Sequence, residues 1–84
     1  MVDLEQRVLA NIKQLRILRQ YSQHYLAYKL GITQAAYSKV ESGFSKIIIN
    51  RLHSIANVLG IETYYLLKFD MNHLIHFANN QGEQ

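Results

Sequence analysis

One short stretch of the chain carries side chains suited to recognition chemistry, and these are Gln34, Ala35, Ser38 and Lys39. Their spacing places them on one face of a helix. Glutamine can pair with N6 and N7 of adenine, lysine with O6 and N7 of guanine, and alanine can contact the methyl group of thymine. Taken singly, Gln34 or Lys39 is better interpreted as a residue on the solvated face of a plain helical hairpin than as a base contact. The four together favour contact with the base edges of DNA.

A helix that bears these residues needs neighbours that hold it in place. Two short helices are predicted over residues 23–30 and 34–42, because Ser22 and Thr33 are residue types that cap helix N-termini. Gly31 lies between them, where the backbone must turn abruptly and where glycine adopts a positive φ without a steric penalty. The pattern therefore predicts two helices that meet across a very tight turn.

Small and apolar residues fill the angle between these two predicted helices. Ala27 is expected to face the second helix, since a small side chain lets two helix axes cross closely at a steep angle. The space between the helices is expected to be filled by the side chains of Ile32, Tyr37 and Val40. The joint spacing of small residue, glycine, apolar residues and polar face predicts a helix-turn-helix unit over residues 22–43.

The rest of the chain is also predicted to be helical, because its 84 residues include no proline and only four glycines. Apolar residues from Leu4 to Leu18, spaced three and four apart, predict a first helix that ends a residue or two later. A fourth helix is predicted over residues 49–59 and a fifth over residues 62–67. The expected fold is all-α: a compact bundle of about five helices in one domain, residues 1–69, followed by a short tail.

Composition excludes several classes of protein. Hydrophobic residues make up 49% of the chain and charged residues 18%, as in a globular protein. Cysteine is absent, which excludes disulfides, thiolate metal sites and cysteine nucleophiles. No apolar stretch approaches the roughly 20 residues that span a bilayer, and the first residues do not resemble a signal peptide. A soluble cytoplasmic protein with no membrane partner is expected.

The net charge of +3 is unevenly distributed along the chain. Residues 1–46 carry seven Lys and Arg against three Asp and Glu, a net charge of +4, whereas residues 47–84 carry two against three. A polyanion would be drawn to the N-terminal half. On charge alone, ordinary solvated surface residues are the better interpretation, so the charge supports DNA binding only together with the spacing above.

Longer sequence motifs point to a family. They are Ile12-Lys13-Gln14-Leu15-Arg16, Ser22-Gln23, Leu26-Ala27, Leu30-Gly31-Ile32, Tyr37-Ser38-Lys39-Val40-Glu41-Ser42-Gly43, Leu52, Ile55-Ala56 and Leu59-Gly60-Ile61. Through them, residues 12–67 resemble the phage repressor-like helix-turn-helix domains, the Cro/CI or XRE family. The resemblance implies a lambda repressor-like fold and a sequence-specific regulator of transcription that binds double-stranded DNA. It also implies a bacterial, phage or mobile-element origin and no cofactor.

The resemblance assigns roles to individual residues. Base contacts fall to Gln34, Ala35, Ser38 and Lys39, and phosphate contacts to Ser22, Gln23, Thr33, Ser42 and Lys46. Arg16 and Glu41 stand where the family has an ion pair between its first helix and its recognition helix, so a partly buried bridge is expected. The chain departs from many relatives at Lys46-Ile47-Ile48-Ile49, where a helix cap and further basic residues are missing.

The tail, residues 70–84, fits two kinds of structure. Its apolar spacing fits a helix capped by Asp70, while the alternation across residues 75–77 also fits a strand. Leu74, Ile75 and Phe77 supply apolar surface beyond what one small core needs. A homodimer assembled partly through this tail is therefore expected, with packing of the tail on its own domain as the alternative. The end of the tail is expected to be disordered.

The alternatives to DNA binding are a protein-interaction module, a metal-binding protein and an enzyme. An antitoxin, or another protein-interaction module of this fold, would use the apolar tail to cover a toxin or other protein partner. His73 and His76 would share a helix face, but no carboxylate or further histidine pair accompanies them at ligand spacing, so no metal site is expected. An enzyme is not expected, because no sharp turn, glycine-rich loop or carboxylate pair arranges the polar residues.

Overall fold

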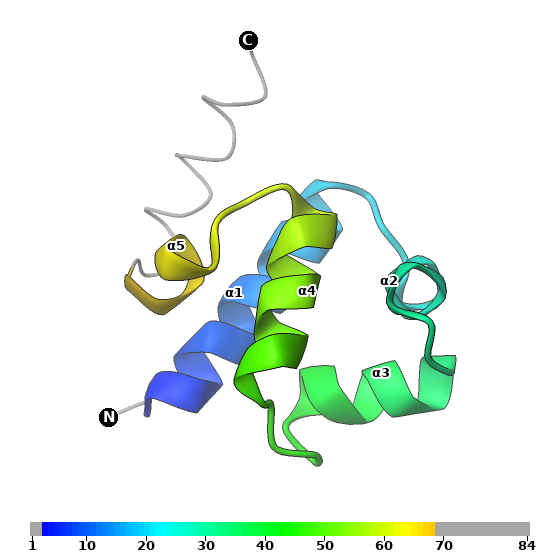
Figure 1. Cartoon of the computed structure of the whole chain (residues 1–84), viewed down its shortest axis with the longest axis horizontal. Coiled ribbons are helices and arrows are strands. Elements are labelled where there is room, and N and C mark those ends of the chain that lie inside the picture. Colours follow the sequence, from blue (N-terminus) through cyan, green and yellow to red (C-terminus); the bar gives the residue numbers. More distant parts are fainter. Residues whose placement is uncertain (1–2, 69–84) are drawn as a thin grey trace, which may run out of the picture.

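The computed structural model of the chain describes residues 3–68. Within that range α1 spans Leu4–Leu18, α2 Gln23–Leu30, α3 Gln34–Ser42, α4 Ile49–Leu59 and α5 Thr63–Lys68 (Figure 1). The prediction of an all-α fold with about five helices is confirmed. The expectations for the tail, including the dimerisation candidates Leu74, Ile75 and Phe77, lie outside the described residues.

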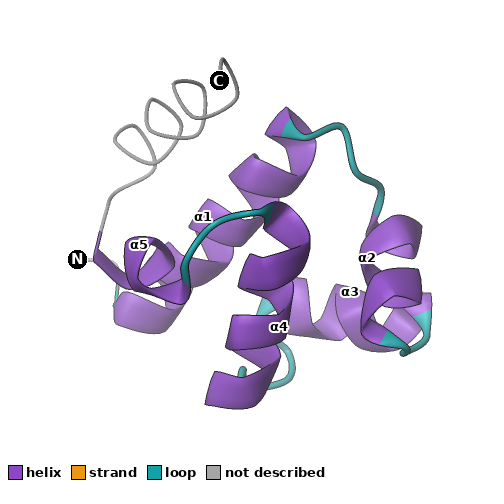
Figure 2. Ribbon diagram, turned by 45° about the horizontal axis from the view of Figure 1, so that its top comes forward, coloured by secondary structure: helices purple, strands orange, loops and turns teal. Residues whose placement is uncertain are grey.

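The helices α1 and α4 form the centre of the molecule. The helices α2 and α3 pack against each other on one side of this pair, and α5 packs against α1 and α4 on the other side (Figures 1 and 2). All five helices contribute to one apolar core, made of Val8, Leu9, Ile12, Leu15, Leu26, Ala27, Tyr37, Leu52, Ile55, Ala56, Leu59, Ile61 and Leu66. Burial of this surface is the main term that favours folding.

Local sequence explains where the first three helices begin. The side chains of Asp3, Ser22 and Thr33 each accept a hydrogen bond from the backbone N–H three residues later, at 2.8, 2.9 and 3.0 Å. Each such cap stabilises its helix by about 1 kcal/mol. Ile48, which precedes α4, makes no side-chain cap hydrogen bond. The loss of a cap before the fourth helix, noted in the sequence, is therefore present in the structure.

The first helix spans the residues that the sequence predicts, but the apolar residues at its two ends are exposed. Leu4 and Leu18 belong to its apolar pattern, yet they are 54% and 36% exposed. After α1, Gln20 adopts a left-handed φ of 63°, a conformation that glycine or asparagine usually supplies. The N–H of Tyr21 donates to the carbonyl of Arg16 at 3.0 Å and closes the helix end. The residue type of Gln20 does not indicate this turn.

Candidate nucleic-acid interface

The turn between α2 and α3 is built around Gly31. This residue ends α2 with a φ of 71°, the left-handed conformation expected of a glycine here. The N–H of Ile32 donates to the carbonyl of Ala27 at 3.0 Å. The side chain of Ala27 is buried, so the two helices approach each other closely. The prediction that two short helices meet across a tight turn in residues 22–43 is confirmed.

One face of α3 is anchored to α1 by an ion pair. Nε and Nη2 of Arg16 donate to Oε2 and Oε1 of Glu41 at 2.9 and 3.0 Å, a two-pronged arrangement that fixes both side chains. The side chains of Arg16 and Glu41 are 12% and 3% exposed. The structure thus places the expected partners of the ion pair in contact and shields them from water.

Two further side chains share the carboxylate of Glu41. The hydroxyl of Tyr37 donates to Oε2 at 2.6 Å, and the side-chain amide of Gln23 donates to Oε1 at 3.3 Å. Nη1 of Arg16 donates to the carbonyl of Tyr21 at 2.8 Å. The carboxylate therefore connects α1, α2 and α3. Sequence reasoning placed Tyr37 in the core but missed its bond to Glu41, although the spacing of four residues on one helix was an available signal.

The charge states in this cluster follow from its contacts. Burial alone would raise the pKa of Glu41, but hydrogen bonds from Arg16, Tyr37 and Gln23 outweigh burial and hold that pKa below its usual range. Burial, and then the bond to Glu41, raise the pKa of Tyr37. The hydrogen bond to Glu41 raises the pKa of Arg16, although burial opposes this. At neutral pH the cluster is a carboxylate held by a guanidinium and a neutral phenol.

The opposite face of α3 is open to solvent. Gln34, Ala35 and Lys39 are exposed, and Ser38 is half-buried beside them. The structure therefore brings the four candidates for base contact together on one helix. Glu41 is the only acidic residue of α3, and its carboxylate is turned inward and paired. This outward face presents neutral and basic groups alone.

The candidates for phosphate contact fall into two groups. Ser22, Thr33 and Lys46 are exposed, and the two hydroxyls accept backbone N–H groups, which leaves their own hydrogens able to donate. The hydroxyl of Ser42 instead donates to the carbonyl of Lys39 at 3.2 Å. Gln23 is half-buried, and its side-chain amide donates to the carboxylate of Glu41. The structure thus gives Gln23 and Ser42 partners within the protein that sequence reasoning did not anticipate.

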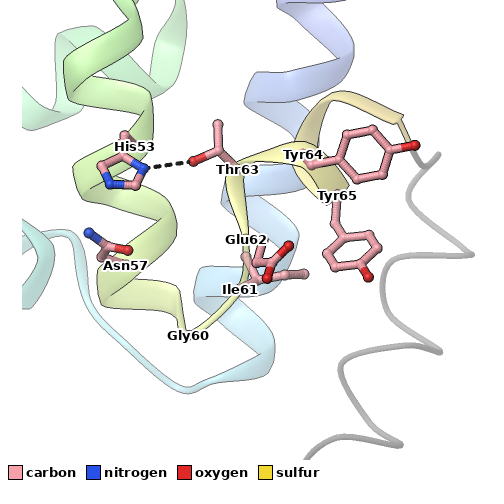
Figure 3. Close-up of a pocket in the computed structure, with 8 residues that line it drawn as sticks. All are labelled: His53, Asn57, Gly60, Ile61, Glu62, Thr63, Tyr64 and Tyr65. Atoms are coloured by element: carbon pink, nitrogen blue, oxygen red, sulfur yellow. Dashed lines mark hydrogen bonds between the residues drawn. The ribbon is translucent and has the colours of Figure 1, made fainter.

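A separate hollow lies between the end of α4 and the start of α5 (Figure 3). It is lined by His53, Asn57, Gly60, Ile61, Glu62, Thr63, Tyr64 and Tyr65. Nδ1 of His53 lies 3.1 Å from the hydroxyl of Thr63, a hydrogen bond that joins α4 to α5. Over residues 3–68, no three His, Asp or Glu side chains are placed to hold a metal ion. In that same range no helix has the length and apolar character to cross a membrane.

Comparison with known proteins finds matches that cover most of the chain. A family model described as "Helix-turn-helix" matches residues 12–66. The chain is 34% identical over 70 residues to the SPbeta prophage-derived uncharacterized HTH-type transcriptional regulator YonR of Bacillus subtilis, a match that covers 77% of this chain and 65% of YonR. It is 37% identical over 62 residues to the uncharacterized HTH-type transcriptional regulator YqaE of the same organism, covering 74% of this chain and 53% of YqaE.

These relatives are longer than the region they share with the chain. The match spans just under two thirds of YonR and about half of YqaE. Both relatives are described as regulators of transcription, and neither is described as an antitoxin. No solved structure matches the chain.

Proposed function

The chain belongs to the phage repressor-like (XRE) helix-turn-helix family, and we propose that it regulates transcription by binding a specific site on double-stranded DNA. The recognition helix is α3, which lies in the major groove. The observation that carries this proposal is the division of α3 into a buried face, fixed through Tyr37 and Glu41, and an exposed face of neutral and basic side chains. Regulation then comes from occupying an operator and involves no chemical reaction.

The exposed face of α3 reads the base edges. Gln34 pairs with adenine, Lys39 with guanine, and Ala35 contacts a thymine methyl group, while Ser38 offers a hydroxyl to either kind of base. Such contacts determine sequence preference. The cluster around Glu41 supports this reading because it holds the buried side of α3 against α1 and α2.

The ends of α2 and α3 hold the DNA backbone. The hydroxyls of Ser22 and Thr33 lie at the helix N-termini, where unpaired amides and the helix dipole favour a phosphate group. Gln23 contributes through its main-chain N–H, since its side chain holds Glu41. Lys46 and Ser42 add contacts at the C-terminal end of α3. Phosphate contacts of this kind set the register of the protein on the duplex.

The active form is proposed to be a C2 homodimer with two copies of α3 about 34–36 Å apart on successive major grooves. Ile48 and Ile49 support this, because they are 65% and 75% exposed and border an apolar groove whose other walls include Leu4, Leu52 and Leu67. Contiguous exposed apolar surface marks interaction sites. Sedimentation that shows a monomer at all micromolar concentrations, with and without DNA, would contradict the dimer.

A binding selection from a random duplex library at one fixed salt concentration tests the function. The wild-type chain is expected to enrich one sequence motif, and the double variant Gln34→Ala/Lys39→Ala is expected to lose or change that motif. Thermal unfolding of both proteins controls for folding. Absence of any enriched motif would contradict the proposed function, whereas an unchanged motif with the double variant would contradict the roles of these two residues.

A further inference from the structure

Phe44 lies two residues beyond the end of α3, in the loop that leads to α4. Its side chain is 79% exposed, more than any other large apolar side chain among residues 3–68. The phenyl ring thus contributes almost nothing to the core, although burying it would favour folding. The ring is therefore accessible to a binding partner.

The backbone that carries this exposed ring is fixed on both sides. The N–H of Ser45 donates to the carbonyl of Lys39 at 3.1 Å, and that of Phe44 donates to the hydroxyl of Ser42 at 3.4 Å. Gly43 has a φ of 85°, and a Cβ there would stand 3.3 Å from Cδ1 of Leu9, so the turn lies close against α1. The loop therefore presents the ring from a defined position beside the recognition helix.

The surroundings of the ring suit a polyanion. Nζ of Lys39 lies 5.6 Å from the ring centroid, within the range of a cation–π contact. Ser42 and Lys46 lie on the two sides of Phe44 in the sequence and are exposed. Glu41 is the only acidic residue between positions 33 and 46, and it is buried and paired. This combination favours a nucleic acid over an apolar protein surface as the partner of Phe44.

We propose that Phe44 is a specificity-determining residue that recognises a thymine through its 5-methyl group, at the end of the site read by α3. The inference rests on the proposed function and extends it to a residue outside the helix. A phenyl ring has no hydrogen-bonding group, and the thymine methyl is the one apolar group that base pairs display in the major groove. Through the cation–π contact, Phe44 also positions Lys39 over the neighbouring base pair.

The test replaces the thymines of the selected site by deoxyuridine, one at a time, because this removes only the methyl group. With the wild-type chain, replacement of the thymine at the end of each half-site is expected to weaken binding roughly fourfold, the value of one buried methyl group, in addition to the effect at the thymine that Ala35 contacts. With Phe44→Ala, the same replacement is expected to change nothing. Phe44→Leu keeps an apolar side chain and is expected to keep part of the discrimination.

A matched control shows whether any exposed aromatic residue behaves in this way. Tyr64 is 55% exposed on α5, which packs on the far side of α1 and α4 from α3. Tyr64→Ala is expected to keep the full sensitivity to deoxyuridine. Thermal unfolding of both variants is expected to match the wild type, because neither ring belongs to the core.

The outcomes separate this inference from the proposed function. If Phe44→Ala weakens thymine and deoxyuridine duplexes equally, the ring does not contact the methyl group and the inference is wrong. A Phe44-dependent rise in the fluorescence of 2-aminopurine placed in the site would indicate insertion between bases, which also overturns it. A motif that is enriched and depends on Gln34 and Lys39 leaves the proposed function standing in both cases. If no motif is enriched, both proposals fail.

Discussion

The two faces of α3 satisfy their polar groups in different ways. On the buried face, the carboxylate of Glu41 accepts four hydrogen bonds from Arg16, Tyr37 and Gln23. On the outward face, Gln34 and Lys39 are exposed to water. Under the proposed function, this helix of nine residues assigns folding to one set of side chains and recognition to another. Changes on the first face should alter stability, and changes on the second should alter binding.

The largest effect is expected from Glu41→Ala. Loss of the carboxylate leaves the guanidinium of Arg16 without its charged partner, although the side chain of Arg16 is only 12% exposed. Removing one partner of a buried ion pair costs about 3–5 kcal/mol. Chemical denaturation measures the free energy of unfolding. The fraction that stays folded at low temperature is expected to keep the sequence preference of the wild type.

Arg16→Ala and the double variant complete a mutant cycle around this pair. The sum of the two single losses is expected to exceed the loss in the double variant, because each single variant already breaks the same interaction. Strictly additive losses would contradict a shared role of Arg16 and Glu41 and would remove the contrast between the two faces.

Acid is expected to weaken the buried face without any mutation. Because the pKa of Glu41 is lower in the folded chain than its usual value of 4.5, its contribution to stability is complete above that value and is lost as the pH falls below it. The Tm of the wild type should therefore drop more steeply below this pH than the Tm of Glu41→Gln. Parallel curves for the two proteins would show that Glu41 is not the group responsible.

Smaller losses, in binding rather than folding, are expected on the outward face. Gln34→Ala and Lys39→Ala should each cost on the order of 1–3 kcal/mol on the selected site and change the preferred base there. Fluorescence anisotropy with matched and mismatched duplexes measures both effects. The Tm should stay at its wild-type value, since both side chains are exposed. A fall in Tm comparable to that of Glu41→Ala would contradict the separation of the two faces.

The smallest effect is expected from Lys46→Ala, beyond the end of α3. A phosphate contact carries no sequence information, so all duplexes should bind more weakly by a similar factor. The slope of log affinity against log salt concentration should become shallower by about one. Lys68→Ala, at the end of α5, is the matched control and should leave that slope unchanged.

Local signals in the sequence were sufficient to predict where α2 and α3 begin and where the chain turns between them. Ser22 and Thr33 are caps, and Gly31 adopts the positive φ that its position required. Each of these features depends on residues within a few positions of one another. The same holds for the missing cap at Ile48, which is visible in the residue type alone.

Features that depend on distant residues were not predictable in this way. The side chain of Gln23 holds a carboxylate 18 positions away, so its capacity for a phosphate contact could not be judged from its own helix. Gln20 takes a left-handed conformation where the sequence offers no glycine, because the chain must turn from α1 into α2. The exposure of Phe44 could not be predicted from the sequence, since it follows from the path of the loop and not from the residue type.

The shared carboxylate of Glu41 has a consequence for the free energy of the proposed DNA binding. Since one group joins α1, α2 and α3, these helices would meet the proposed DNA site with their arrangement already set, and little configurational entropy would be lost in ordering them. Any change of shape on binding must then occur in the DNA duplex. Flexible base steps at positions that no side chain touches would consequently influence which operators are preferred.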